Sequence, residues 1–194
     1  MPAELVEIPG YVAGTWDIDP VHSEVGFTVR HLMISKVRGR FRTFEGRIVT
    51  AADPRESSVT ATIDLSSVDT GNKQRDDHVR NADFLEVDKY PAMTYRSTGL
   101  RPDGDDFLLD GELTLKGVTL PVPLRLEVHG FGPDPFVPDP FAGARVGFTA
   151  TGEINRMDFG VSYNGPIPGG GVGLSEKVQI VLEIQAALRT RATR

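Results

Sequence analysis

The residues that could do chemistry in this chain are four histidines and the carboxylates near one of them. His78 stands beside Asp76 and Asp77 in a polar stretch, and an Asp–His pair could work as acid and base in an enzyme. A solvated helix face explains the same residues, so both interpretations remain open. The histidines show no HExxH motif and no close pair, and the sequence therefore predicts no metal site.

The composition also argues against cysteine-based sites, phosphate-binding loops and nucleic-acid binding. The chain has no cysteine, which removes disulfides, thiolate chemistry and cysteine zinc sites. The glycine run at 169–173 is not followed by the lysine of a phosphate-binding loop. A net charge of -6 argues against nucleic acid as a partner and against broad docking on anionic lipid. The alternating Lys36, Arg38, Arg40 and Arg42 are interpreted as a solvated strand face.

Most of the elements that must position the candidate residues are strands. Apolar residues recur at every second position, first at Val25, Phe27 and Val29 and then in seven later segments. The period slips between Phe41 and Phe44, which predicts a β-bulge near Thr43. The eight predicted strands lie at about residues 25–31, 37–48, 59–65, 93 onward, 107–115, 118–128, 146–154 and 178–184.

Closing these strands on one another would leave no sheet edge exposed. We therefore predict an all-β fold, an eight-stranded antiparallel barrel at 14–189, with short tails at 1–13 and 190–194. The polar segment 72–81 lacks the two-residue period and is predicted as a short helix between the third and fourth predicted strands. Pro121 and Pro123 predict an edge or an irregular stretch in the sixth strand.

An eight-stranded barrel either fills its interior with side chains or holds one small ligand. The predicted inward faces mix large residues with small ones such as Gly39, Ala61 and Gly111. Small inward residues either leave a cavity or mark bends in the strands, and the pattern leaves both possibilities open. A cavity lined by Phe, Leu, Val and Ile would select apolar ligands, at about 0.8 kcal/mol per buried CH₂.

The N-terminal segment has neither the basic nor the apolar region of a secretory signal. The longest apolar runs are too short for a transmembrane helix. We therefore expect a cytoplasmic protein without a transmembrane segment.

Four ordered blocks of residues resemble the YceI-like family. The first contains DPVHS at 19–23, GRF at 39–41 and FEG at 44–46. The second contains VDTGN at 68–72 and YP at 90–91, with Arg75, Asp76, His78, Arg80, Asp83 and Phe84 between them. The third is LTLKGVT at 113–119 followed by PV at 121–122, and the fourth is INR at 154–156 with DFG at 158–160. In this order the blocks span about residues 14–187.

The resemblance implies an extended lipocalin-like barrel with the helix near its mouth. It implies a bound polyisoprenoid, such as a quinone tail, or a similar long amphiphile, with no other cofactor required. It also implies carriage or storage rather than turnover, and it is consistent with a homodimer. The Pro-rich segment PDPFVPDPF at 133–141 is longer than the family pattern predicts.

The resemblance and the face parity of the strands together predict which residues contact this ligand. Tyr95 and His31 are the candidates to meet a polar head group. Two other functions remain open, an enzyme acting on a lipid or quinone through Asp76 and His78, and an interaction protein with a filled barrel. The predicted contact residues are Phe27, Val29, His31, Phe41, Phe44, Ile63, Phe84, Met93, Tyr95, Leu113, Leu115, Leu124, Phe148 and Leu182.

Overall fold

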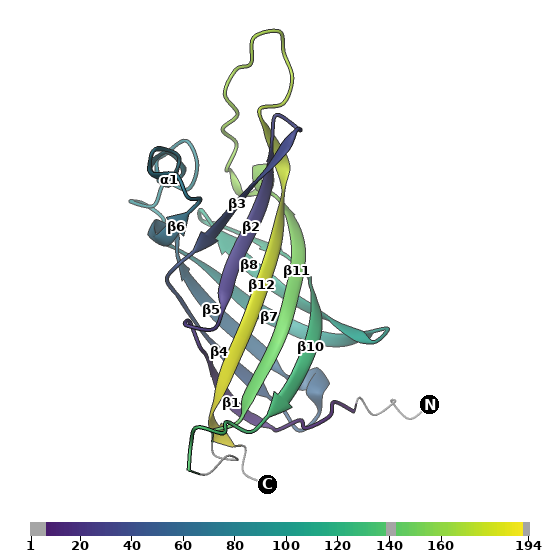
Figure 1. Ribbon diagram of the computed structural model, residues 1–194. Helices are drawn as coiled ribbons and strands as arrows, with labels where there is room; N and C mark the ends of the chain where they lie inside the picture. The colour runs from purple at the N-terminus through teal and green to yellow at the C-terminus, as the bar shows by residue number, and fades with distance from the viewer. Residues whose placement is uncertain (1–6, 139–142, 192–194) are drawn as a thin grey trace.

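The fold is an antiparallel barrel, seen in a computed structural model that describes residues 7–138 and 143–191 (Figure 1). The strands in that part of the chain are β1 (Gly14–Ile18), β2 (Glu24–His31), β3 (Ser35–Phe41), β4 (Phe44–Thr50), β5 (Ser58–Asp64), β6 (Val68–Asp69), β7 (Ala92–Asp103), β8 (Asp106–Leu115), β9 (Val118–Pro121), β10 (Leu124–Gly132), β11 (Arg145–Asn155) and β12 (Leu174–Arg191). The helices are α1 (Lys73–Arg80) and the 3₁₀ turns η1 (Pro54–Glu56), η2 (Leu65–Ser67) and η3 (Arg156–Phe159).

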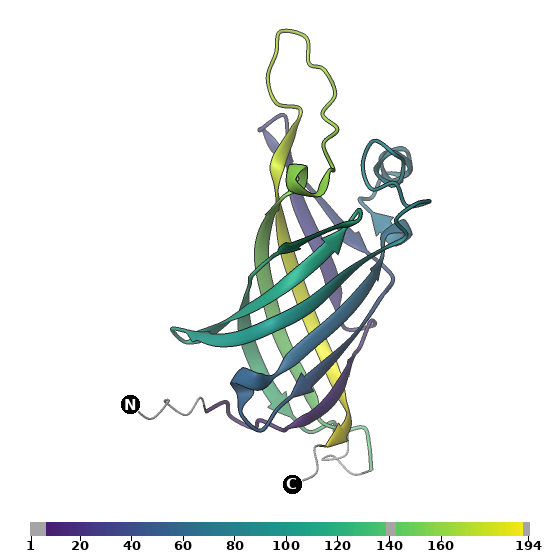
Figure 2. The same ribbon diagram turned by 180° about the vertical axis from the view of Figure 1, so that it is seen from behind.

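Eight of these strands close into a ring. Its order is β1, β4, β5, β7, β8, β10, β11 and β12, and β12 pairs with β1 again. The long β12 has two partners on its other side, because Ala186–Arg191 pair with β1 whereas Leu174–Glu183 pair with β2. The β2–β3 hairpin therefore extends the wall beyond the ring, toward the end of the barrel that carries α1 (Figures 1 and 2).

The predicted barrel is confirmed, but the predicted position of the helix between the third and fourth strands was wrong. The helix lies where its residues were predicted, at 73–80, yet it follows β6 rather than the third of eight strands. The count changes because the five-residue β1 and the two-residue β6 show almost no pattern, and because the predicted strand at 37–48 divides into β3 and β4. The sixth predicted strand divides into β9 and β10 between Pro121 and Leu124, where the prolines predicted an irregular stretch.

The predicted bulge near Thr43 is a change of partner instead. β3 pairs with β2, whereas β4 pairs with β1. Between them the backbone N–H of Arg42 donates to the carbonyl of Ser67, and that of Thr43 donates to the Ser67 hydroxyl, at 3.2 and 3.0 Å. The shift in apolar period therefore marks a corner where one strand ends and the next begins.

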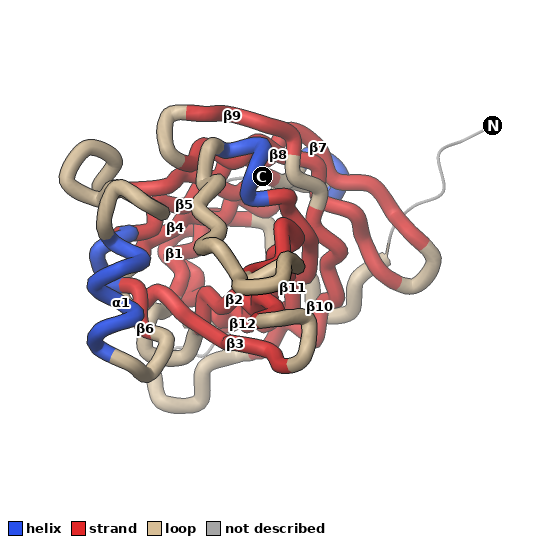
Figure 3. Tube along the Cα trace, turned by 90° about the horizontal axis from the view of Figure 1, so that it is seen from above, coloured by secondary structure: helices blue, strands red, loops and turns tan. Residues whose placement is uncertain are grey.

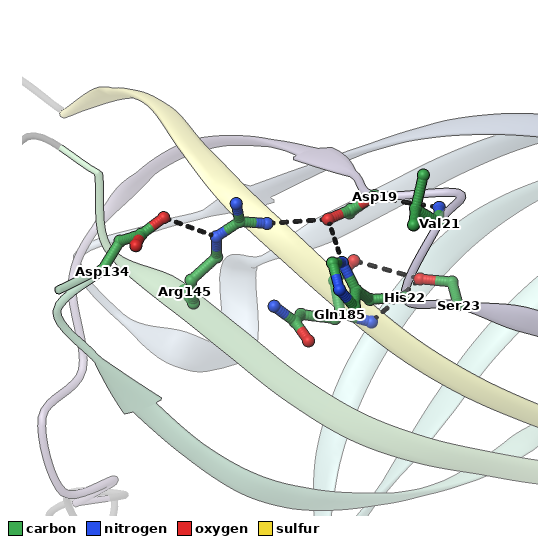
Figure 4. Close-up of polar contacts among 7 residues, drawn as sticks. All are labelled: Asp19, Val21, His22, Ser23, Asp134, Arg145 and Gln185. Atoms are coloured by element: carbon green, nitrogen blue, oxygen red, sulfur yellow. Dashed lines mark hydrogen bonds and ion pairs between the residues drawn. The ribbon is translucent and has the colours of Figure 1, made fainter. Parts of the chain in front are cut away.

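A polar network fixes the matching corner between β1 and β2 (Figure 4). Asp19 accepts hydrogen bonds from the backbone N–H of Val21 at 3.0 Å and from the Arg145 guanidinium at 2.9 Å, and it contacts His22 Nδ1 at 2.7 Å. Arg145 also pairs with the buried Asp134 at 3.1 Å. The network joins the corner to the start of β11, so the residue types of the first family block serve the bend here.

One end of the barrel, which we call the Trp16 end, is closed by packed side chains. Trp16 is completely buried, and its indole N–H donates to the Thr50 hydroxyl at 2.8 Å. Ala186 and Leu188 of β12 and Ile48 of β4 pack in the same cluster. This cluster is separate from the main core and lies where β1 joins β12.

The opposite end, the α1 end, is covered by segments outside the strands. Asn72 caps the helix by accepting from the backbone N–H of Arg75 at 2.9 Å. The segment after the helix folds back onto it, because the N–H groups of Leu85 and Val87 donate to the carbonyls of Val79 and Arg80, at 3.0 Å each. No helix in the described ranges is long and apolar enough to cross a membrane.

Candidate ligand cavity

The barrel encloses a cavity of about 330 Å³, within the range of small-molecule sites. Strands from all around the ring, which Figure 3 shows from above, contribute to its wall. Val79, Phe84 and Leu85 line it at the α1 end. The lining is dominated by aliphatic and aromatic side chains. Side chains therefore do not fill this interior completely.

Thirteen of the fourteen predicted contact residues line this cavity. His31 does not: the regular register of β2 keeps it on the same strand face as Phe27 and Val29, but it lies exposed near the tip of the β2–β3 hairpin, beyond the cavity. Whether the other residues touch a ligand remains a prediction. They are Phe27, Val29, Phe41, Phe44, Ile63, Phe84, Met93, Tyr95, Leu113, Leu115, Leu124, Phe148 and Leu182.

Two of the small inward residues, Gly39 and Gly111, do not themselves create the free space. A Cβ added to Gly39 would lie 2.3 Å from the ring of Phe27, and one added to Gly111 would lie 2.3 Å from the Tyr95 hydroxyl. Each glycine thus makes room for an aromatic ring that projects from the neighbouring strand. The alternation of large and small residues therefore reflects ring packing inside the wall.

Tyr95 is already engaged within the protein. Its hydroxyl donates to the carbonyl of Val122 at 2.9 Å, and burial raises the pKa of this phenol far above its ordinary value. The hydroxyl is thus a neutral donor that satisfies the irregular backbone between β9 and β10. With His31 outside the cavity, neither predicted head-group residue offers a free polar group to the interior.

Three rings pack together at the α1 end. The centroids of His78 and Phe84 are 5.0 Å apart, those of Phe84 and Tyr163 are 5.2 Å apart, and those of His78 and Tyr163 are 5.1 Å apart. All three pairs meet edge to face, a favourable arrangement of aromatic rings. Because Phe84 also lines the cavity, this cluster links the helix and the 160–173 segment to the ligand space.

The proposed acid–base pair is not assembled. Asp76 is buried and accepts hydrogen bonds from the backbone N–H and the hydroxyl of Thr70. His78 Nε2 instead contacts Asp83 at 2.8 Å. The two side chains therefore serve different partners that hold the helix and its flanking segments. Within the described ranges, no three His, Asp or Glu side chains converge on one point.

Arg156 is the buried cation at this cavity, and the sequence interpretation assigned it no role. It is 3% exposed and lines the α1 end. Its guanidinium donates to the carbonyls of Val161 and Tyr163, at 2.6 and 2.8 Å, and to those of Leu174 and Ser175, at 3.2 and 2.9 Å. Burial lowers the pKa of this guanidinium. The fork geometry of arginine allows one side chain to bind several carbonyls and so tie η3 and the 160–173 segment to β12.

The comparisons with known proteins agree with this geometry. The family model of the YceI-like domain matches residues 16–186. The chain belongs to the YceI-like family. Protein YceI of Escherichia coli O17:K52:H18 is 38% identical over 178 residues, which cover 90% of this chain and 87% of that protein.

Solved structures show the same barrel. A YceI protein of Campylobacter jejuni is 29% identical, with a TM-score of 0.69 over 88% of this chain and 96% of that one. A polyisoprenoid binding domain from Saccharophagus degradans is 19% identical, with a TM-score of 0.66 over 92% of this chain and all of that one. At this identity the second likeness shows the fold alone.

Proposed function

We propose that this YceI-like chain binds and carries a long apolar lipid, a polyisoprenoid or the isoprenoid tail of a quinone, inside its barrel. The observation that carries the proposal is the apolar cavity inside the barrel, whose lining includes residues of both the Trp16 end and the α1 end. The Saccharophagus degradans neighbour, which is described as a polyisoprenoid binding domain, supports this choice of ligand class.

The chemistry of the wall favours recognition by buried area. Each CH₂ that leaves water for the cavity contributes about 0.8 kcal/mol, so a chain of several isoprene units gains affinity without any hydrogen bond. The Tyr95 hydroxyl and the Arg156 guanidinium are occupied by backbone carbonyls. The interior therefore selects length and apolarity, while the head group contributes less.

The α1 end is the proposed passage for the ligand. It is held by contacts between side chains and backbone carbonyls, which include Lys116 Nζ donating to the carbonyl of Phe84 at 2.8 Å. Such contacts can be broken locally without opening the strand ladder of the barrel. The Trp16 end, in contrast, is filled by the buried Trp16 cluster beside the β1–β12 ladder.

Native mass spectrometry of the purified protein, followed by organic extraction, tests the proposal. We expect one long isoprenoid per chain, either carried from the cells or taken up when ubiquinone or a polyprenol is offered. The same spectrum reports whether the chain is the homodimer that the family resemblance allows. A mass without ligand and no uptake of either lipid would contradict the proposal.

A cavity-filling variant locates the ligand. Ala61 lines the cavity from β5, so Ala61→Trp should remove most lipid uptake by occupying the space. Thr60→Trp is the matched control, because the neighbouring side chain is exposed on the outside of the same strand. Full uptake by a folded Ala61→Trp protein would place the ligand elsewhere.

A further inference from the structure

The tip of the β2–β3 hairpin exposes three consecutive apolar side chains. Leu32 is 43% exposed, Met33 is 54% exposed and Ile34 is 83% exposed. Single exposed apolar residues are ordinary on protein surfaces, whereas adjacent ones at a projecting tip mark a contact surface. Ile34 is therefore mostly open to solvent, and the other two are about half exposed.

The backbone of the tip makes these residue types more unusual. Leu32 and Met33 have φ angles of +53° and +56°, and the N–H of Ile34 donates to the carbonyl of His31 at 3.0 Å. Positive φ at both central residues is the pattern of a type I′ turn, which Asn-Gly adopts with least strain. Leucine and methionine are therefore placed where the turn itself favours small or polar residues.

The strands behind the tip are strongly basic on their outer face. Residues 30–42 contain Arg, Lys and His but no carboxylate. Arg30 lies directly opposite Lys36, a like-charge pair that opposes strand pairing. Arg40 and Arg42 pair with Asp69, whereas Arg30, Lys36 and Arg38 form no ion pair within residues 7–138 and 143–191.

This hairpin projects at the α1 end of the barrel (Figure 1). The backbone N–H of Leu32 donates to the carbonyl of Gly173 at 2.8 Å, and the adjacent Val172 is 46% exposed. Leu174 pairs with His31 and also lines the cavity. The apolar tip and its basic flank therefore lie beside the proposed ligand passage.

We infer that the β2–β3 hairpin is a docking surface for an anionic lipid bilayer. The tip residues enter the interface between head groups and acyl chains, while Arg30, Lys36 and Arg38 face the phosphates. Apolar residues flanked by basic ones are the combination that binds such surfaces. Docking in this orientation places the α1 end against the membrane. The local cluster of cations allows this contact although the net charge of the chain is -6.

A second copy of the chain is a poorer occupant. A stable interface buries roughly 800 Å² on each partner, and three side chains of which two are about half exposed supply far less. The unpaired cations would also need carboxylates on the partner, whereas a bilayer offers phosphates at any register. The surface does not depend on the identity of the lipid in the barrel.

Vesicle flotation tests the inference. We expect the protein to float with vesicles of equal parts phosphatidylcholine and phosphatidylglycerol and to bind phosphatidylcholine alone weakly. Leu32→Asn with Met33→Gly and Ile34→Thr keeps a favourable turn and removes the apolar tip, so it should weaken binding at least about tenfold. Val181→Thr, an exposed apolar position on β12, is the matched control and should bind normally.

A charge variant tests the basic flank. Arg30→Gln with Lys36→Gln and Arg38→Gln should weaken binding about a hundredfold, at about fivefold per charge near an anionic surface. Arg47→Gln with Arg96→Gln and Arg189→Gln removes the same charge elsewhere and should bind as the parent does.

Three results would overturn the inference: a parent protein that does not float, a tip variant that floats equally well, or a dimer that the tip variant loses while neither protein binds vesicles. Native mass spectrometry of the tip variant separates this surface from the proposed function. Lipid retained in the barrel without vesicle binding by the parent protein would refute docking alone.

Discussion

The two ends of the barrel are closed by different kinds of interaction. At the Trp16 end, the β1–β12 ladder continues to the last described residue of β12, and a fully buried indole fills the interior beneath it. At the α1 end, the cover consists of a short helix, 3₁₀ turns and a long segment, held by Arg156 and Lys116 through backbone carbonyls. The Trp16 end is therefore part of the hydrophobic core, whereas the α1 end is covered by segments that side-chain hydrogen bonds hold in place.

Under the proposed function, this difference assigns ligand exchange to the α1 end, because the eight-stranded ring itself is closed by the β1–β12 ladder. Separating β1 from β12 would cost the ladder and the packed cluster together. Releasing the α1 end would cost a few charged hydrogen bonds and the contacts of three aromatic rings. The free energy of local opening should therefore be far lower at the α1 end.

Trp16→Ala should produce the largest effect, because it breaks the closed end. We expect the free energy of unfolding to fall by about 3–5 kcal/mol, the cost of emptying a large buried aromatic site. Thr50 also loses the indole N–H that its hydroxyl accepts. Urea denaturation measures the change, and Val49→Ala, at an exposed apolar position, is the control. A change below about 1 kcal/mol would show that this cluster does not close the barrel.

Arg156→Lys tests the cover of the α1 end. Lysine keeps the charge but cannot reach four carbonyls in a planar fork, so we expect a loss of about 2–3 kcal/mol. Hydrogen exchange should accelerate across 160–174 and remain slow in β1. Arg125→Lys, an exposed arginine paired with Asp106, is the control and should change stability little. Equal acceleration at both ends would contradict the proposed division of the barrel.

Leu32→Asn with Met33→Gly tests whether strain is stored at the α1 end. Asparagine and glycine adopt positive φ with little strain, so the double variant should gain about 1 kcal/mol in stability. The denaturation midpoint measures the gain. Leu32→Ala with Met33→Ala is the control, because it removes the same apolar side chains without relieving the backbone. A gain in both variants would attribute the effect to the apolar surface instead.

The barrel was predictable because a single physical signal repeats along the chain. Each strand has one apolar face, and the two-residue period identified the wall and thirteen residues that line the cavity. β1 and β6 escaped prediction because five and two residues are too few to show a period. The corner at Thr43 shifted the period as a bulge would, and only the pairing partners distinguish the two.

The polar residues of the site were harder to predict, since their partners lie far away in the sequence. Asp76 and His78 look like a catalytic pair in sequence but bind Thr70 and Asp83. Arg156 gives no local signal, because its acceptors are backbone carbonyls that any sequence supplies. The space inside the barrel was also undecidable, because Gly39 and Gly111 accommodate rings and leave no void.

The Asp19 corner between β1 and β2 should have the smallest effect on stability, and this effect should depend on pH. The hydrogen bond with His22 is the main cause that lowers the pKa of Asp19, and Arg145 adds to it. A lowered carboxyl pKa contributes stability above the ordinary value of about 3.9, and this stability is lost as the pH falls through the lower folded pKa. The contribution should be no more than about 1 kcal/mol, because His22 is exposed.

Asp19→Asn should therefore reduce stability at pH 7 and lose less than the parent protein between pH 7 and pH 3. Urea midpoints at the two pH values measure this difference. Asp88→Asn serves as the control, because that carboxylate is exposed and forms no ion pair in the part of the chain that the structure describes. An Asp19→Asn protein with the same acid sensitivity as its parent would show that the corner contributes nothing to it. The acid response would then arise from other carboxylates with lowered pKa, such as Asp134, which accepts from the backbone N–H of Phe136 and from Arg145.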